Sequence, residues 1–181
     1  VLSADQALYG NDYRSYERAF DLLTQVVGRS GRGKYPGRAI IQTFTPENKI
    51  IKLAAEQNYP EFFKGEIALR REMLYPPFAD LCVVGFVGAD EAKVRLASIS
   101  FMCRLRETAK TEYSDLPMRV LSPSPALIGK VSNKYRYKLL IKCRNSKRLR
   151  ELISRLLIWF PGCREHDGVT AFADINPNTI L

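Results

Sequence analysis

Two arginines set among glycines are the residues of this chain whose types and spacing best suit a chemical role. They lie in the run Gln25-Val26-Val27-Gly28-Arg29-Ser30-Gly31-Arg32, which has the form Q-x-x-G-R-x-G-R. Glycine lets a backbone approach a ligand closely, and arginine offers a permanent charge and a planar fork that fits phosphate oxygens. Phosphoryl transfer uses such groups, because an arginine finger neutralises charge on the γ-phosphate. Arg29 and Arg32 are therefore candidate catalytic residues, while a helix end with two exposed arginines is the plainer interpretation.

The segment that must position these arginines is expected to be mostly helical. Apolar residues recur at helical spacing over residues 15–27, and the glycines from Gly28 onward are expected to break that helix. The apolar run Ala39–Phe44 predicts a buried strand. Two further helices are expected, one opened by Pro46 and one over Pro60–Leu74.

The order of elements changes after Tyr75-Pro76-Pro77-Phe78, which forbids helix continuation and marks a domain boundary. The expected elements are a strand over Leu81–Val87, a helix over Asp90–Tyr113, a short strand at Arg119–Leu121, a hairpin of Leu127–Val131 and Tyr135–Cys143, a helix over Ser146–Phe160 and a strand over Val169–Ile175. Ser122-Pro123-Ser124-Pro125 is expected to be irregular. Apart from the short strand, the order is β-α-β-β-α-β, which predicts a split βαβ fold with an antiparallel sheet and two helices on one of its faces.

The positive charge of the chain is concentrated in one segment. The net charge is +9, and residues 119–155 alone carry eleven Lys or Arg against one acid, Glu151. A localised basic patch implies an acidic partner, with nucleic acid first, whereas a solvated face that aids solubility is the alternative. The candidate DNA-binding residues surround the predicted hairpin and are Lys130, Lys134, Arg136, Lys138, Lys142 and Arg144.

Strand alternation predicts how the hairpin presents these charges. Arg136 and Lys138 should share one face of the strand with Lys142 and Arg144, and the apolar side chains of Leu139, Ile141 and Cys143 should point the other way. Tyr135 and Tyr137 belong to a residue type that stacks on bases, but tyrosine in a strand more often packs within the sheet. No base-reading module is evident, so phosphate contacts without sequence preference are expected.

The composition disfavours several other kinds of protein. No run of eighteen apolar residues occurs and no signal-peptide pattern opens the chain. Cys82, Cys103, Cys143 and Cys163 lie too far apart for a zinc-type pair, so we expect no metal site and reduced, mostly buried thiols in a cytoplasmic protein. The one histidine, His166, lies in a polar run and is expected to be exposed.

The sequence around these motifs resembles the PriA family (primosomal protein N′) of bacterial replication-restart DNA helicases. Gln25–Arg32 is similar to motif VI of superfamily 2 helicases. The other runs that carry the resemblance are Ala4-Asp5, Leu8, Asp12-Tyr13-Arg14, Glu17-Arg18, Pro36-Gly37, Gln42-Thr43-Phe44, Pro46, Tyr59, Phe62, Glu66, Arg70-Arg71, Tyr75–Phe78, Ser124–Ala126, Tyr135–Ile141 and Asp174–Pro177. The set covers nearly the whole chain, and its order is specific although no single motif is unique.

The resemblance implies an α/β architecture in two parts. Residues 1–75 would be the C-terminal portion of a second RecA-like helicase lobe with its trailing helices, and residues 79–181 a DNA-binding accessory domain similar to a small ribosomal-subunit protein. The intact protein would be an ATP-dependent 3′–5′ DNA helicase that recognises stalled or abandoned replication forks and initiates primosome assembly. The cofactor-binding residues implied are Gln25, Gly28, Arg29 and Arg32, which would face ATP across the cleft between two lobes.

Parts of the family's pattern are missing from this chain. A P-loop of the G-x-x-x-x-G-K-[ST] type, a metal-binding DExH-type motif and paired zinc-binding cysteines are absent, and all of them would lie upstream. The resemblance implies ATP, Mg²⁺ and zinc as cofactors of the intact protein. The chain alone is expected to bind none of them and to hydrolyse no ATP, because arginine fingers act on a nucleotide held elsewhere.

The resemblance also implies partners for a monomer that does not bind membranes. They are forked DNA, single-stranded DNA-binding protein and other primosome proteins. The candidate residues for the acidic, hydrophobic-ended tail of single-stranded DNA-binding protein lie on the helix from Ser146 beside an apolar stripe, and are Lys147, Arg148, Arg150 and Arg155. The same charges would also suit DNA.

Three other classes of protein stay open at this point. A RecG-like superfamily 2 translocase would share motif VI, but the Tyr75–Phe78 junction and the following order of elements argue against it. A non-enzymatic RNA- or DNA-binding module would leave Gln25–Arg32 unexplained. A protein-interaction domain would use the basic face to dock an acidic peptide.

Overall fold

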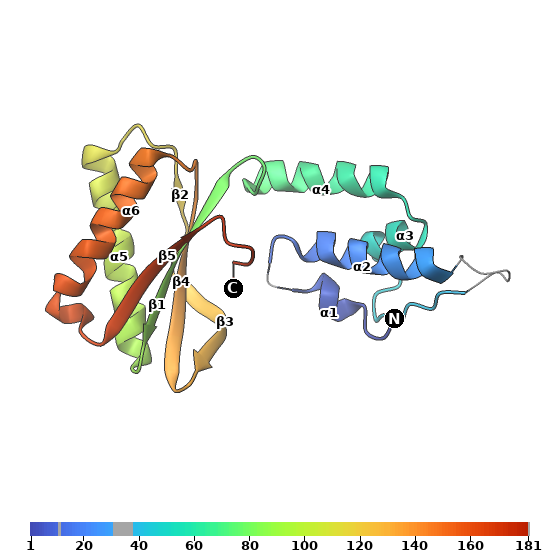
Figure 1. Ribbon diagram of the computed structural model, residues 1–181, viewed down its shortest axis with the longest axis horizontal. Coiled ribbons are helices and arrows are strands. Elements are labelled where there is room, and N and C mark those ends of the chain that lie inside the picture. The colour runs from blue at the N-terminus through green and yellow to red at the C-terminus, as the bar shows by residue number, and fades with distance from the viewer. Residues whose placement is uncertain (11, 31–37, 181) are drawn as a thin grey trace. The chain divides into compact units, whose positions relative to one another are not determined.

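Two units, Val1–Met73 and Leu74–Leu181, make up the computed structural model of this chain (Figure 1), which describes residues 1–10, 12–30 and 38–180. The division falls beside the Tyr75–Phe78 segment. Within those ranges, none of the helices combines the length and the apolar composition that a bilayer crossing requires.

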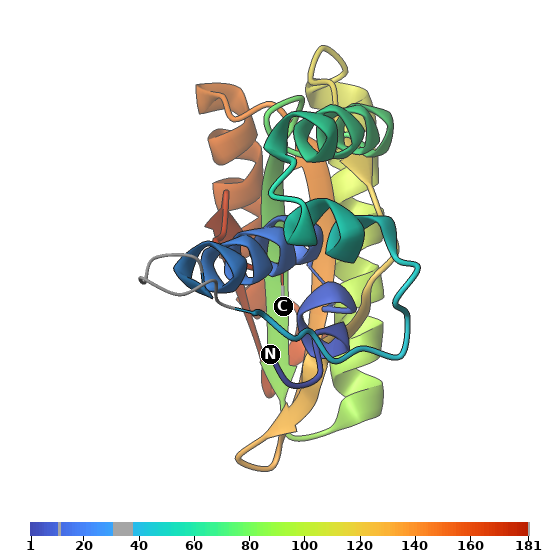
Figure 2. The ribbon, with the colours of Figure 1, turned by 90° about the vertical axis from the view of Figure 1, so that its right-hand side faces the viewer.

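The first unit is helical. Its elements are α1 (Asp5–Leu8), α2 (Ser15–Ser30), α3 (Lys49–Ala55) and α4 (Tyr59–Met73). The axes of helices α2 and α4 are nearly parallel, since both are seen almost end-on in Figure 2, and the chain runs in opposite directions along them (Figure 1). Phe20 of α2 stacks on Phe62 of α4 with ring centroids 4.0 Å apart, and Leu8, Leu23 and Ala54 complete the buried cluster around this pair.

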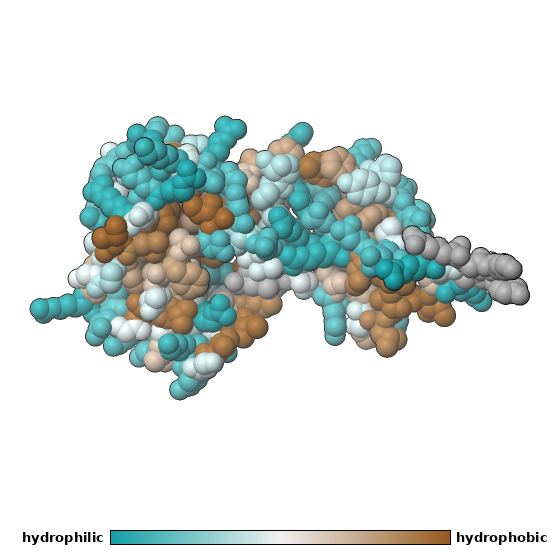
Figure 3. Space-filling view, in the orientation of Figure 1, coloured by the Kyte–Doolittle hydropathy of each residue, from teal (hydrophilic) through white to brown (hydrophobic). Residues whose placement is uncertain are grey.

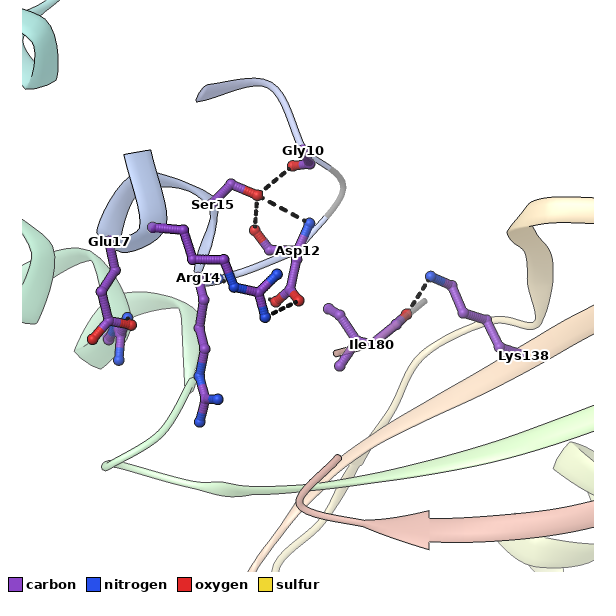
Figure 4. Close-up of polar contacts among 9 residues, drawn as sticks. Gly10, Asp12, Arg14, Ser15, Glu17, Lys138 and Ile180 are labelled. Atoms are coloured by element: carbon purple, nitrogen blue, oxygen red, sulfur yellow. Dashed lines mark hydrogen bonds and ion pairs between the residues drawn. The ribbon is translucent and has the colours of Figure 1, made fainter. Parts of the chain in front are cut away.

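Side-chain hydrogen bonds set where these helices begin. The Ser15 hydroxyl lies 2.8 Å from the carbonyl oxygen of Gly10 and 2.7 Å from that of Asp12, which closes the turn before α2 (Figure 4). Asn48 Oδ1 accepts from the Ile50 N–H at 2.9 Å, and Asn58 Oδ1 accepts from the Glu61 N–H at 3.2 Å. Each asparagine satisfies an N–H that the first helical turn leaves without a partner.

Two predictions for this unit are wrong. Helix α2 continues through Gly28 and Arg29 to Ser30, because a glycine within a helix costs only about 1 kcal/mol relative to alanine and packing outweighs it. Ala39–Phe44 forms no strand. Its backbone bonds reach the first residues of the chain, with the Gln42 N–H donating to the Val1 carbonyl and the Ala4 N–H donating to Gln42. Two such bonds do not make a ladder, and a strand needs a partner along its whole length.

An ionic cluster joins α2 to α4. Arg70 Nε donates to Glu66 Oε1 at 2.8 Å one turn earlier, and its Nη2 reaches Glu17 Oε2 on α2 at 2.9 Å. The guanidinium also lies 5.4 Å from the Tyr13 ring centroid. The Arg70 and Glu66 side chains are only 13% and 8% exposed, so each charge is largely removed from solvent and is balanced by the other.

The second unit combines a sheet with two helices. Over residues 74–180 the elements are β1 (Asp80–Gly88), α5 (Glu91–Glu112), β2 (Arg119–Val120), β3 (Ser124–Val131), β4 (Lys134–Cys143), α6 (Lys147–Trp159), the 3₁₀ turns η1 (Phe160–Gly162) and η2 (Arg164–His166), and β5 (Val169–Ile175). The strands pair antiparallel in the order β2-β4-β1-β5, and β3 also pairs with β4. The predicted antiparallel sheet with helices on one face is confirmed, since α5 and α6 lie on the same side of it (Figure 1).

One detail of the hairpin differs from the prediction. Strand β3 begins at Ser124 and includes Pro125, which was expected to be irregular. Proline is tolerated there because β3 is an edge strand, so the N–H that proline lacks is not needed for a second ladder.

The core lies between the sheet and the helices. Leu139 and Ile141 of β4 and Phe86 of β1 are fully buried under α5 and α6. Phe86, Phe101 and Phe160 form a triad of rings whose centroids lie 5.5 to 5.9 Å apart. Such tilted aromatic pairs contribute beyond the area they bury.

His166 is buried, which contradicts the predicted exposed turn. The 3₁₀ turns fold it back over Phe160, and the two rings stack at 4.2 Å. Its Nδ1 donates to the Phe160 carbonyl oxygen at 2.9 Å, and its Nε2 lies 3.0 Å from Ser100 Oγ. Both ring nitrogens therefore have partners, and the histidine serves packing.

The cysteines are all free thiols, as expected from their spacing. Cys82 and Cys143 are buried on the helix side of the sheet, whereas Cys103 is exposed. Burial raises the pKa of Cys82 to about 12 and that of Cys143 to about 11. Neither forms a thiolate near neutral pH, so both are inert packing residues.

A cluster of hydrogen bonds around Asp80 lies at one end of the sheet. The Asp80 carboxylate accepts from the Asn145 N–H and from the Asn176 side-chain amide, each at 2.8 Å. Asn176 in turn accepts from the Leu81 N–H at 3.0 Å. The bond from Asn145, then that from Asn176, lowers the pKa of Asp80 below its usual value, against a smaller opposing effect of burial. This hydrogen-bond cluster thus links the residues at the ends of β1, β4 and β5.

Replacing Asp80 with alanine is expected to lower the free energy of unfolding by about 1 to 2 kcal/mol near pH 6, because charge-assisted bonds are lost. The contribution of a carboxylate with a lowered folded-state pKa is present above the ordinary value of about 3.9 and disappears as the pH falls through the lower folded value. The gap between parent and variant should therefore close between pH 4 and pH 2 in denaturant titrations. Asp167→Ala, in the exposed turn before β5, is the matched control, and a gap that persists at low pH would contradict this role of the Asp80 charge.

Candidate nucleotide and nucleic-acid contacts

The described part of the arginine motif lies on the last turns of α2. Gln25 and Arg29 are four residues apart, so they project from the same face of the helix. They line an open hollow of about 510 Å³ together with one acid, Asp21, and with Thr24, Gln57 and Tyr59. Both side chains are exposed. Arg32 and Gly31, the rest of the predicted motif, lie outside the described residues.

This face of α2 suits a phosphate better than a metal ion. Over residues 1–10, 12–30 and 38–180, the Arg29 side chain has no hydrogen bond or ion pair, so its charge is available to an anion from solvent. Gly28 faces Gln57, whose side-chain nitrogen would lie 3.4 Å from a Cβ at that position. In the same ranges, no three His, Cys, Asp or Glu side chains gather as a metal site requires. Gln25, Gly28 and Arg29 therefore fit the periphery of a bound phosphate, and residues outside this unit would have to supply the rest.

The basic residues of β4 alternate across the sheet. Leu139 and Ile141 point into the core, which places Arg136 and Lys138 on the opposite face. We call the side of the sheet away from α5 and α6 the open face, and we call Lys134, Arg136 and Lys138 the basic row. The row begins at the hairpin turn and follows β4 along the open face. Each of its three side chains is at least partly exposed.

The other predicted DNA contacts are placed differently. Lys130 pairs with Tyr135, so it lies on the other face of the hairpin, with its ammonium 4.6 Å from that ring. Lys142 shares the open face but is only 7% exposed, and its Nζ lies 3.7 Å from the Tyr75 ring centroid. Arg144 is exposed in the loop after β4. DNA contacts from these three residues stay predictions.

Lys138 has a contact of its own in this unit. Its Nζ donates to the carbonyl oxygen of Ile180 at 2.5 Å (Figure 4). An ammonium carries three donors and a full charge, so it still attracts a phosphate while this bond is made. The segment after β5 therefore borders the basic row.

The tyrosines of β4 are not the aromatic residues that face solvent. Tyr137 is buried among the core residues, and its hydroxyl lies 3.3 Å from Glu91 Oε1, so the expected packing within the sheet is confirmed for this tyrosine and it is not available to stack on a base. Phe172 of β5 is 47% exposed instead. Alternation along β5 places it on the same face as Asp174, but a lone phenylalanine in a strand is usually a core residue, so the sequence alone does not distinguish it.

Two arginines of α6 already have acidic partners. Arg148 Nη2 lies 3.0 Å from Asp115 Oδ1 and also donates to the Glu112 carbonyl oxygen, and Arg155 pairs with Glu112. The apolar stripe beside them, which includes Leu149 and Leu152, is the buried face of the helix. A hydrophobic tail would therefore not find that stripe exposed. Lys147 and Arg150 are also exposed on this helix.

These features define a small mixed α/β domain, with an antiparallel sheet covered by helices on one face and lined by cations on the other. Residues 71–178 match the family described as the primosomal protein N C-terminal domain, and the chain belongs to this family.

Its relatives are replication restart proteins. The chain is 35% identical over 181 residues to replication restart protein PriA of Bacillus subtilis (strain 168), which covers 100% of this chain and 22% of the relative. It is 38% identical over 144 residues to PriA of Synechocystis sp., covering 78% of this chain and 16% of the relative. For PriA of Chlamydia muridarum the identity is 36% over 179 residues, with 99% and 23% covered. The chain thus spans about a fifth of the length of these relatives.

Proposed function

We propose that the second unit binds DNA, without sequence preference, through the open face of its sheet, as the accessory domain of a replication-restart helicase. The observation that carries the proposal is the basic row. Lys134, Arg136 and Lys138 lie on alternate residues of β4 and therefore on one face. A strand rises about 3.3 Å per residue, so successive members of the row are about 7 Å apart along it. The row can follow a phosphate backbone, whereas scattered surface charges cannot.

The same geometry explains why no sequence preference is expected. Lysine and arginine heads reach phosphate oxygens, which are the same at every nucleotide. Each neutralised phosphate releases condensed counterion, so the affinity should fall with salt at a log–log slope of about −0.9 per contact on duplex DNA. A hairpin and a helix cannot face one duplex together, so we expect about three to five contacts and a slope of about −3 to −5.

Replacing Lys134, Arg136 and Lys138 together with alanine is expected to weaken the binding of every DNA by about ten-fold or more at low salt, and to reduce the slope by about 2 to 3. The measurement is fluorescence anisotropy with forked and linear DNA over a series of salt concentrations.

The matched control removes three exposed cations of α5 in the same unit, Lys93, Arg95 and Lys110. It has the same net charge as the test variant. Equal losses in both variants would indicate a general charge effect. An unchanged basic-row variant would leave the row as a solvated surface and contradict the proposal.

For the first unit, we propose that residues 1–75 are the end of the second RecA-like lobe of an ATP-dependent 3′–5′ DNA helicase. Two features support this. Gln25 and Arg29 share an exposed face of α2, and apolar side chains reach the surface of this unit, as brown patches in Figure 3 indicate. Ile40 is 77% and Phe44 is 90% exposed. Large apolar side chains so exposed are expected where further parts of the same lobe pack against them in the intact protein.

In the intact protein, bound ATP with Mg²⁺ would supply the phosphoryl group. The role of this chain would be electrostatic, because Arg29 and Arg32 present fixed positive charge where negative charge develops. Gln25 would orient its neighbours from the same helix face. ATP, Mg²⁺ and an upstream zinc site thus remain part of the proposal for the whole protein.

Partners beyond DNA follow from the same proposal. Single-stranded DNA-binding protein and other primosome proteins are expected to meet the intact protein at a fork. If the acidic tail of single-stranded DNA-binding protein docks on α6, it must rely on Lys147, Arg148, Arg150 and Arg155 and not on the stripe between them. Competition by Glu112 and Asp115 for two of these arginines argues for a weak contact.

A further inference from the structure

An aromatic ring lies on the open face beside the basic row. Phe172 of β5 pairs directly with Gly85 of β1. A Cβ built on Gly85 would lie 2.4 Å from Phe172 Cζ and 2.8 Å from each Cε, so the ring leans across the glycine and occupies the space where a side chain would stand. One side of the ring therefore rests on the backbone, and 47% of the residue stays exposed.

The sheet register places a cation next in the same line. Gly85 pairs with Phe172 on one side and with Lys138 on the other. Neighbouring strands are about 4.8 Å apart, so Phe172 and Lys138 stand about 10 Å apart, with the glycine between them. Arg136, Lys138, Phe172 and Asp174 also line one hollow of about 70 Å³, bordered by Pro177 and Thr179 of the segment after β5.

The surroundings of this ring favour an anionic ligand. Among the described strand residues, the open face carries one acid, Asp174, against the three cations of the basic row. A ring that only filled the space over Gly85 would need no such neighbours. A phosphate chain with planar groups matches both the cations and the ring.

We propose that Phe172 stacks on an unpaired base of single-stranded DNA, while Arg136 and Lys138 hold the phosphates beside that base. The inference rests on the proposed DNA-binding function and names the form of DNA that the open face accepts. A base inside a duplex has both faces covered by its neighbours, so an aromatic ring on a sheet can reach only a base that is unpaired. The glycine matters because it lets the ring lie low, which leaves room for the base above it.

Replacing Phe172 with leucine tests the stacking directly. Affinity for oligo-dT is expected to fall by about five- to ten-fold, since base–aromatic stacking contributes on the order of that or more per base. Affinity for blunt duplex DNA should change by less than about two-fold. The salt slope should stay as in the parent, because no phosphate contact is removed. Phe172→Trp, which keeps an aromatic face, should restore binding of oligo-dT.

The matched ligand is an oligonucleotide of the same length with abasic sites, which keeps the phosphates and removes the bases. The parent chain should bind it about as weakly as Phe172→Leu binds oligo-dT, and Phe172→Leu should lose nothing further on it. Thermal unfolding of each variant is measured alongside, because leucine uncovers Gly85.

The outcomes separate this inference from the function on which it rests. If Phe172→Leu binds oligo-dT like the parent, or loses duplex and abasic DNA to the same degree, the stacking inference is overturned. Loss of binding in the basic-row variant would still support the proposed function in that case. An acidic peptide of equal charge is the last comparison. If it competes as well as oligo-dT does, and Phe172→Leu changes the affinity of neither ligand, the open face is a general anion surface and the inference fails.

Discussion

Arg29→Ala in the full-length protein is expected to reduce ATP turnover by about 10³-fold or more and to weaken nucleotide binding by a much smaller factor. Arginine fingers act through charge that develops in the transition state, which is why they contribute about 10³- to 10⁵-fold in rate and little to ground-state binding. Arg29 suits this role because its guanidinium is exposed at the end of α2 beside Gln25. Arg32→Ala is expected to reduce turnover to a similar extent and to leave nucleotide binding largely intact.

DNA-stimulated phosphate release and the equilibrium binding of a fluorescent nucleotide are the two measurements required. Lys64→Ala is the matched control, since Lys64 is an exposed cation on α4 of the same unit. Wild-type turnover in both arginine variants would return these residues to the role of a solvated helix end. A loss of nucleotide binding equal to the loss of turnover would indicate ground-state contacts instead of a finger.

Arg70→Ala is expected to lower the stability of the first unit by about 3 to 5 kcal/mol. The variant leaves Glu66 with a side chain that is 8% exposed and no guanidinium to balance its charge. It also breaks the link from α4 to Glu17 on α2, whose own side chain is 43% exposed and can return to water. The loss therefore comes mainly from the uncompensated carboxylate of Glu66 and not from the attraction within the pair.

The double variant Glu66→Met with Arg70→Met separates these two causes. When both buried charges are replaced by apolar groups of similar size, the change is expected to be small, because neither charge is left without a partner. Hydrogen exchange of the α4 amides reports the stability of this unit directly, with Lys64→Ala as the control. A double variant as unstable as Arg70→Ala would show that the ionic bonds themselves stabilise the unit.

The sequence alone determined the elements of the second unit, since these depend on local patterns. Asp90 and Ser146 mark the starts of α5 and α6, and their side chains do cap those helices. Two-residue alternation along β4 separated Arg136 and Lys138 from Leu139 and Ile141. Such patterns survive folding because they express which face of an element can be buried.

Predictions failed where a residue's surroundings come from distant parts of the chain. The segment Ala39–Phe44, expected to be a strand, has no hydrogen-bonded partner for most of its length. The apolar pattern of a segment does not show whether a partner strand is available to it. His166 looked polar and exposed by its neighbours in sequence, yet Phe160 and Ser100 enclose it. Glu66 and Arg70 matched the family without any sign that they form a buried ionic cluster with Glu17.

The candidate DNA site divides along the same line. Its charge, its strand and the alternation of its cations follow from the order of residues in β4, because neighbours on one strand fix which face each side chain takes. Phe172 lies over Gly85 and in line with Lys138 because of the register in which β5, β1 and β4 pair, and these strands are far apart in the sequence. Register is set when the sheet pairs and buries one face against α5 and α6, so only the tertiary structure could bring the aromatic ring and the cations together.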